Sequence, residues 1–125
     1  MEELLKNSDI VTVHVPFSLE TKNLIDSDQF GMMQDTIFIN ASRGEVINEN
    51  ALVEALENKC VKSAGLDVLS NESNLDFSSN PLINYARLHD NLIITPHCAG
   101  SSNDALKQTF LFSAKKLINY LNKNE

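Results

Sequence analysis

Three side chains of the sequence could together carry out acid/base chemistry on an acidic substrate: Arg43, Glu72 and His97. An arginine fork holds a carboxylate through two parallel hydrogen bonds. A histidine beside a carboxylate can exchange a proton near neutral pH, because the carboxylate orients the ring and stabilises its charged form. The set would suit a 2-keto or 2-hydroxy acid. Taken singly, Arg43 would be a surface ion-pair partner in most proteins, and Glu72, in a polar loop, is more often solvated than catalytic.

Alternating strands and helices must position these side chains. Short β-branched, apolar runs predict four strands, over residues 9–15, 36–40, 61–68 and 91–95. Helical segments are predicted between them: one or two turns within 19–33 capped by Asp26 or Ser27, a helix from the Asn48 cap to Asn58, and a short helix near 81–87. The first strand is nearly continuously apolar, so we expect it to be covered on both faces.

The C-terminal part of the sequence predicts a polar loop and a long helix. Residues 70–80 are mostly Ser and Asn, which is typical of a surface loop. The helix should run from near Ser101 to about Asn122, with Ser101 and Asp104 as a capping box. Leu111 and Phe112 widen its apolar surface. We expect one apolar stripe to face the sheet, formed by Leu106, Phe110, Ala114, Leu117 and Leu121.

Strands separated by helices predict β-α-β units with right-handed crossovers. The predicted fold class is therefore α/β, a partial Rossmann-like doubly wound parallel sheet of about four strands with flanking helices. Ligands bind beyond the carboxyl ends of the strands in such sheets. The segments that follow the four strands carry Arg43, Asp67, Glu72 and His97. We expect these side chains to meet at one rim of the sheet.

The same segments carry the motifs of a known family. They read Val-His-Val-Pro at 13–16, Asn-Ala-Ser-Arg-Gly at 40–44, Gly-Leu-Asp-Val at 65–68 with Glu72 five residues after Asp67, and Thr-Pro-His at 95–97 followed by Ala99 and Gly100. In this order they resemble the D-isomer-specific 2-hydroxyacid dehydrogenases over nearly the whole chain. The resemblance implies hydride transfer between a nicotinamide cofactor and a 2-hydroxy or 2-keto acid. The cofactor would be NAD, with NADP left open.

The resemblance also implies the site residues. His97 would exchange the proton with the substrate oxygen, Glu72 would support His97, and Arg43 would bind the substrate carboxylate. The cofactor-binding positions would be Val15, Pro16, Thr21, Ala41, Ser42, Arg43, Asp67, His97, Cys98, Ala99 and Gly100. Asp67 could instead merely cap a turn. No metal site is predicted, because Cys60 and Cys98 lack closely spaced Cys or His neighbours.

The sequence departs from the family pattern in two places. Ser73 follows Glu72 where the family commonly has Pro, and the spacing of the four glycines leaves no G-x-G-x-x-G turn for the pyrophosphate. The chain, residues 1–125, therefore resembles the C-terminal portion of a dinucleotide-binding domain, with the glycine-rich first half and the substrate domain absent. We expect it to be inactive alone. Two alternatives are a non-catalytic oligomerisation or cofactor-sensing module and one subunit of a split dehydrogenase.

Charge and hydropathy exclude several classes of partner. The 10 basic and 17 acidic residues give a net charge of −7, with no basic excess for nucleic acid or an anionic membrane surface. The acidic N-terminus without a long apolar core excludes a secretory signal, which favours a cytoplasmic location. Half of a doubly wound sheet has an open edge strand. We therefore expect a homo-oligomer, formed through that edge or near Leu111 and Phe112, or association with a complementing N-terminal half.

Overall fold

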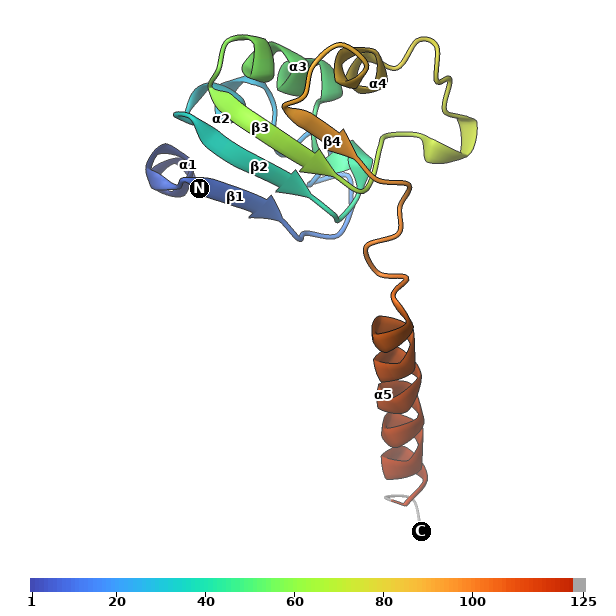
Figure 1. Cartoon of the computed structure of the whole chain (residues 1–125). Coiled ribbons are helices and arrows are strands. Elements are labelled where there is room, and N and C mark those ends of the chain that lie inside the picture. Colours follow the sequence, from blue (N-terminus) through green and yellow to red (C-terminus); the bar gives the residue numbers. More distant parts are fainter. Residues whose placement is uncertain (123–125) are drawn as a thin grey trace.

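Four parallel strands form one sheet in the order β1-β2-β3-β4 in the computed structural model, which describes residues 1–122 (Figure 1). The strands are β1 (Ile10–Val13), β2 (Thr36–Asn40), β3 (Val61–Leu66) and β4 (Leu92–Ile94). The helices are α1 (Glu2–Asn7), α2 (Ser27–Gly31), α3 (Glu49–Glu57), α4 (Pro81–Ala86) and α5 (Asn103–Leu121), with the 3₁₀ turns η1 (Gly44–Val46) and η2 (Glu72–Asn74). The α/β fold with a partial parallel sheet is confirmed.

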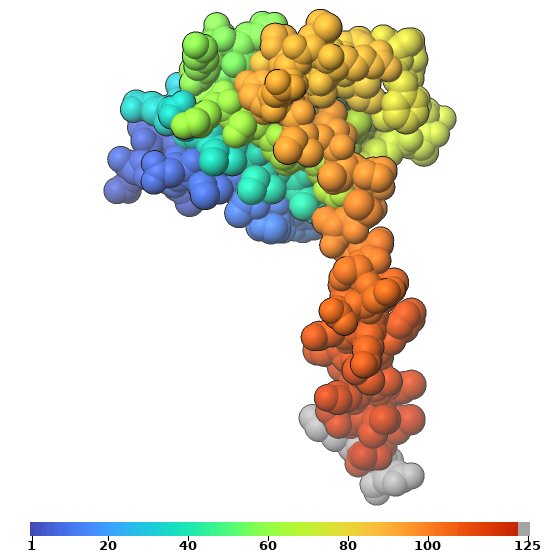
Figure 2. Space-filling view, in the orientation of Figure 1, coloured from blue at the N-terminus to red at the C-terminus, as the bar shows by residue number. Residues whose placement is uncertain are grey.

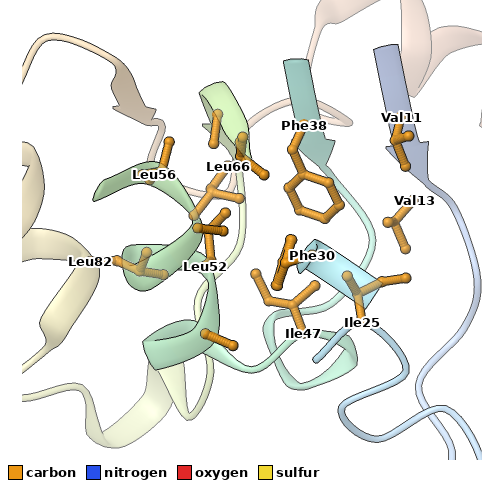
Figure 3. Close-up of a cluster of buried hydrophobic side chains, with 14 of the residues drawn as sticks. Val11, Val13, Ile25, Phe30, Phe38, Ile47, Leu52, Leu56, Leu66 and Leu82 are labelled. Carbon is orange, nitrogen blue, oxygen red and sulfur yellow. The ribbon is translucent and has the colours of Figure 1, made fainter. Parts of the chain in front are cut away.

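The hydrophobic core lies between the sheet and the layer formed by α2, α3 and α4 (Figures 1 and 3). Alternate residues of β1 and β2 point into this layer, as the period of a strand requires. Phe38 of β2 meets Phe30 of α2 edge to face, with ring centroids 5.1 Å apart. Leu52 of α3 and Leu82 of α4 are fully buried in the same cluster. Because all three helices pack here, this face of the sheet is closed.

Side-chain caps fix where three of these helices begin. Asp26 and Gln29 form a capping box on α2, and the Asn48 carboxamide oxygen accepts from the backbone N–H of Asn50 and Ala51 at the start of α3. Asn80 caps α4, whose first residue is Pro81. Each cap satisfies N–H groups that lack a partner within the helix. The predicted helix boundaries at Asp26 and Asn48 are confirmed.

The opposite face of the sheet carries four isoleucines that nothing in residues 1–122 covers. We call Ile10, Ile37, Ile39 and Ile93 the open face. The side chains of Ile10 and Ile93 are 58% and 66% exposed. The prediction that the first strand is covered on both faces is therefore wrong for the described chain, because β1 buries Val11 and Val13 while Ile10 and Thr12 face outward.

Helix α5 stands away from the rest of the molecule (Figures 1 and 2), and none of its residues is buried. The prediction that its apolar stripe faces the sheet is wrong, because the chain leaves the end of β4 outward. Its cap also differs from the predicted one. The hydroxyl of Ser102, rather than Ser101, accepts from the backbone N–H of Ala105 at 3.2 Å. Among the helices of residues 1–122, none combines the length and apolar character needed to cross a membrane.

Candidate active site

The turn that carries Arg43 is organised by Asn40, a fully buried residue at the end of β2. The Asn40 side-chain oxygen accepts from the N–H and the hydroxyl of Ser42, at 3.0 and 2.8 Å. Its amide nitrogen donates to the Arg43 carbonyl at 2.9 Å. The backbone of 41–43 is therefore fixed before any ligand binds. The guanidinium is exposed and donates to the Ser42 carbonyl oxygen at 2.6 Å.

Gly44 brings this turn against the loop that follows β3. A Cβ atom at Gly44 would lie 2.0 Å from the backbone carbonyl carbon of Leu69, far inside any real contact distance. Only glycine permits this approach. Because the two loops touch here, Arg43 lines the same 190 Å³ cavity as Glu72 and His97. Three residues from separate parts of the chain thus meet at one rim, as predicted.

His97 and Glu72 form a direct pair. The Nδ1 atom of His97 lies 2.6 Å from Oε2 of Glu72, and the other Glu72 oxygen accepts from the Leu69 N–H at 2.9 Å. Burial acts to raise the pKa of the Glu72 carboxyl, but the hydrogen bonds from His97 and Leu69 outweigh it and hold the pKa below its ordinary value. Glu72 is therefore ionised at neutral pH and accepts from Nδ1–H. This bond leaves the second ring nitrogen, Nε2, on the side of the ring away from Glu72.

Asp67 holds the segment that presents His97. Its carboxylate, on a side chain that is 7% exposed, accepts from the Thr95 hydroxyl and from the backbone N–H groups of Cys98 and Ala99, the latter two at 2.9 and 2.8 Å. Burial acts to raise the pKa of Asp67, and these hydrogen bonds lower it further than burial raises it. His97, between Thr95 and Cys98, adopts a left-handed backbone with φ of 50°.

The loop that carries Glu72 is tied down by two further carboxylates that the sequence analysis missed. Glu49 of α3 accepts from the Ser70 N–H at 2.7 Å and from the Asn80 amide at 2.8 Å. Glu45 accepts from the N–H of Asn71 at 3.1 Å. These bonds hold the loop in place although Ser73 stands where the family has Pro. A glutamate in the first turn of a helix is ordinarily explained by its favourable interaction with the helix dipole. The position of Glu49 in the sequence therefore does not indicate that its carboxylate also contacts the loop.

The predicted cofactor positions fall into groups. Five of them line one cavity of 670 Å³ beside the end of β1, together with His14, Phe17 and Glu45; these five are Val15, Pro16, Ala41, Ser42 and Arg43. Thr21 does not line this cavity and instead braces its wall, because its hydroxyl donates to the Pro16 carbonyl at 2.8 Å. Cys98 and Ala99 lie at the Asp67 carboxylate, and Gly100 is exposed beyond them.

A more apolar cavity of 520 Å³ adjoins His97 and Glu72 from the side of α4. Leu75, Phe77 and Ile94 contribute to its wall. No local sequence pattern indicates this cavity, because the residues that line it come from separate segments of the chain. Within residues 1–122 no group of three or more His, Cys, Asp or Glu side chains could hold a metal ion.

Comparisons with known proteins agree with this geometry. Residues 1–99 match the family model described as "D-isomer specific 2-hydroxyacid dehydrogenase, NAD binding domain". D-3-phosphoglycerate dehydrogenase of Escherichia coli strain K12 is 37% identical over 123 residues, which are 96% of this chain and 29% of that protein. D-specific alpha-keto acid dehydrogenase of Enterococcus faecalis is 36% identical over 128 residues, 96% of this chain and 40% of the relative.

Solved structures give the same result. The D-lactate dehydrogenase of Lactobacillus jensenii, crystallised with NAD⁺, superimposes with a TM-score of 0.79 at 33% identity, covering 98% of this chain and 39% of that one. The Aquifex aeolicus D-lactate dehydrogenase, complexed with NAD and lactic acid, gives a TM-score of 0.77 at 30% identity, covering 98% of this chain and 40% of that one. The described fold is therefore Rossmann-like. The chain spans well under half the length of these relatives.

Proposed function

Because the chain belongs to the family of NAD-binding domains of D-isomer specific 2-hydroxyacid dehydrogenases, we propose that it carries the acid/base centre of an enzyme transferring a hydride between NAD and a 2-hydroxy or 2-keto acid. The observation that carries the proposal is the 2.6 Å contact between His97 Nδ1 and Glu72 Oε2, on a cavity that Arg43 also lines. A histidine oriented by a carboxylate and placed beside an arginine is suited to a substrate that has both a carboxylate and an adjacent oxygen.

His97 is the proton donor and acceptor of the proposed reaction. In the reducing direction Nε2–H gives its proton to the carbonyl oxygen while the hydride adds to the carbonyl carbon. In the oxidising direction Nε2 takes the hydroxyl proton as the C–H bond gives up its hydride. Glu72 keeps Nδ1 protonated and stabilises the imidazolium that forms. Because Glu72 is itself fixed by the Leu69 N–H, the ring is held in one orientation throughout.

Arg43 binds the substrate carboxylate in this proposal. Its guanidinium is exposed and contacts its own chain at the Ser42 carbonyl. Turning the fork toward a carboxylate exchanges that single bond for two charge-assisted ones. A lysine at this position would provide a point charge without the fork geometry.

The 670 Å³ cavity fits the nicotinamide end of the cofactor. Its volume is within the roughly 300–1,000 Å³ range of small-molecule sites. Val15 and Pro16 give it an apolar wall, and Ala41 and Ser42 also line it, which suits a flat ring with one amide group. NAD supplies or accepts the hydride when bound. Asp67 acts here by holding Cys98 and Ala99, and Thr21 by holding Pro16.

In this proposal the chain supplies only part of the groups that bind cofactor and substrate. No G-x-G-x-x-G occurs in the 125 residues, so the pyrophosphate contacts that such a turn makes and the substrate domain would come from outside them. The 125 residues alone are then inactive, and a complementing N-terminal half or further copies complete the cytoplasmic enzyme. A non-catalytic interaction module is the second candidate, favoured by the exposed open face.

A chimera tests the proposal. Residues 1–122 would replace the superimposed segment of the Lactobacillus jensenii D-lactate dehydrogenase, and oxidation of D-lactate by NAD would be measured. Loss of general acid/base catalysis predicts that His97→Gln lowers kcat by roughly 10²–10⁴. His89→Gln is the matched control, because His89 stacks on Tyr85 at the opposite end of the strands. A folded, active chimera in which His97→Gln matches the control would contradict the assignment.

A further inference from the structure

Two of the cavities at the carboxyl rim of the sheet meet. The 190 Å³ cavity beside His97 and the 670 Å³ cavity beside the end of β1 share the wall residues Arg43 and Glu45. Arg43 already has a role in the proposed reaction, as the group that binds the substrate carboxylate. Glu45 so far has only a contact with the loop that carries Glu72. Because its half-buried side chain is on the walls of both cavities, it is placed to contact a ligand as well.

The junction of these two cavities is where hydride transfer would take place, and this step rests on the proposed function. His97 exchanges a proton with the substrate oxygen, and the hydride passes between the nicotinamide ring and the carbon bonded to that oxygen. Reacting atoms of this kind approach to about 3–3.5 Å. A ring in the 670 Å³ cavity therefore has to meet the substrate close to the residues that line both cavities. This places Glu45 beside the ring.

The charge of the ring changes in this reaction. The oxidised nicotinamide ring carries one positive charge, and the reduced ring carries none. A carboxylate beside the ring therefore attracts the oxidised form and has no such attraction for the reduced form. For two unit charges about 4 Å apart, the attraction is worth about a fivefold change in affinity even in bulk water, and more in a partly buried site.

The fold holds the Glu45 carboxylate in place without neutralising it. Its Oε1 atom accepts from the Asn71 N–H at 3.1 Å, and the Glu45 backbone carbonyl accepts from the Asn23 N–H at 2.9 Å. The ion pairs within residues 1–122 all involve other carboxylates. The side chain thus has a fixed position and a negative charge that a cationic ligand can use.

Arg43 opposes this effect until substrate is bound. Its guanidinium lines the same two cavities and carries the opposite charge. A bound substrate carboxylate would pair with the guanidinium, and Glu72 is already paired with His97. Glu45 is then the unpaired charged side chain beside the ring. Arg43 and Glu45 should therefore act on the cofactor with opposite sign, which a pair of variants can separate.

We propose that Glu45 makes this site favour the oxidised over the reduced nicotinamide ring. Glu45 is a binding residue in this proposal and takes no part in the proton transfer. Its carboxylate lies where positive charge appears when the hydride leaves the ring for a 2-keto acid. The proposal concerns the cofactor alone, so the roles of His97 and Glu72 do not depend on it.

NMR titration of the ¹⁵N-labelled 125-residue protein with two small probes tests the proposal. The probes are the 1-methylnicotinamide cation and its uncharged 1,4-dihydro form, which share the ring and its amide group and differ in charge. Amide shifts of residues 41–45 report binding. The titrations are run at pH 8, above the range in which histidine usually gains its charge, because His14 also lines the cavity. In about 0.1 M salt, charges more than about 10 Å from the ring are largely screened.

Glu45→Gln removes the charge and keeps an oxygen that can accept from the Asn71 N–H. We expect this variant to lose roughly threefold to tenfold in affinity for the cation and less than about twofold for the dihydro form. Arg43→Gln should change the ratio of the two affinities in the opposite direction. Glu49→Gln is the matched control and should leave the ratio unchanged, because Glu49 also holds the loop, through the Ser70 N–H, but lines neither cavity.

Two results would overturn the proposal, with different consequences for the proposed function. In the first, both probes shift the amides of residues 41–45, but Glu45→Gln changes the two affinities by the same factor or by none. Glu45 would then act only through the loop, and the cofactor placement would stand. In the second, neither probe shifts these amides at about 50 mM, well above the millimolar range of weak binding. The cofactor placement would then fail together with the proposal.

A charge-retaining variant separates the effect of charge from the effect of shape. Glu45→Asp shortens the side chain and disturbs its contact with Asn71, but it keeps the negative charge. We expect it to bind the cation more tightly, relative to the dihydro form, than Glu45→Gln does. Equal ratios in the two variants would contradict the proposal. Dispersed amide spectra would verify that each variant is folded.

Discussion

Replacing Asp67 by Asn keeps the shape and volume of the side chain. The substitution should nevertheless loosen the backbone segment that presents His97. One carboxylate oxygen accepts from the Thr95 hydroxyl and the Cys98 N–H, and the other accepts from the Ala99 N–H. Asparagine keeps one acceptor oxygen but turns an amide NH₂ group toward a backbone N–H. The substitution therefore removes the hydrogen bond from the Ala99 N–H. It also makes the acceptor of the Thr95 and Cys98 hydrogen bonds uncharged.

The expected loss of stability can be worked out from these three bonds. A hydrogen bond to a charged group contributes about 1.5–3 kcal/mol, and a buried donor left without an acceptor costs about 1–3 kcal/mol. Loss of the Ala99 bond, with weakening of the other two, predicts that Asp67→Asn lowers the free energy of unfolding by about 2–4 kcal/mol. The free energy of unfolding of a whole domain is only about 5–15 kcal/mol. The change should therefore be large in an ordinary denaturation experiment.

Urea denaturation followed by circular dichroism at several pH values measures this loss. Because the folded-state pKa of Asp67 lies below the ordinary 3.8, its contribution is present above that value and disappears as the pH falls through the folded pKa. The difference between wild type and Asp67→Asn should shrink over that acidic range. Asp76→Asn is the control, because Asp76 accepts similar bonds from Ser78 where water can replace them. If the unfolding free energies of wild type and Asp67→Asn differ by less than about 0.5 kcal/mol at pH 7, the effect is no larger than that of an ordinary surface substitution. This result would refute the reasoning.

Three further predictions concern the loops around the site. Gly44→Ala places a Cβ against the Leu69 backbone, so overpacking should lower the unfolding free energy by about 1–3 kcal/mol, as measured by urea denaturation. Asn40→Ala leaves buried backbone groups without partners and should cost about 2–3 kcal/mol in the same assay; an effect near zero would show that water replaces the side chain. His97→Ala removes a hydrogen bond that lowers the pKa of Glu72, so the pKa of that carboxyl should rise toward the ordinary 4.5 in a ¹³C NMR titration, and an unchanged value would contradict the pair.

The elements of the sheet could be predicted because local sequence and tertiary context agree there. Phe38, flanked by Ile37 and Ile39, gives β2 an apolar run with no competing helical period, and its predicted bounds match the structure. Asn48 caps α3 through side-chain bonds that depend only on nearby residues. Parallel order then follows from the helical connections, which is why Arg43 and His97 could be placed on one rim in advance.

The errors concern two apolar surfaces that residues 1–122 of the same chain leave exposed. The apolar pattern of β1 predicted coverage on both faces, and the α5 stripe predicted packing on the sheet. A hydrophobic pattern indicates that a surface can be buried, but it does not identify what buries it. Ile10 and Leu117 are exposed for that reason. The same limit explains the cap of α5, where Ser101 and Ser102 are chemically equivalent and only the path of the chain chooses Ser102.

The supporting polar contacts of the site could not be predicted because they join distant segments. Glu49 reaches Ser70 across 21 residues and Asn80 across 31. Neither spacing corresponds to a local motif. Asn40 did carry a sequence signal, because it is a polar residue at the end of an apolar strand, where a buried amide has to satisfy backbone groups.

In the proposed reaction this chain itself holds His97 ready for proton transfer, with Nδ1 bonded to Glu72 and Nε2 open to substrate. Long-range ¹H–¹⁵N NMR correlation of the imidazole identifies which nitrogen carries the proton when the ring is neutral. We predict the Nδ1–H form in the wild-type chain, because Nδ1–H donates to the ionised Glu72. We also predict that Glu72→Gln weakens this preference. A neutral His97 protonated on Nε2, in a chain whose sheet is folded, would contradict the claim.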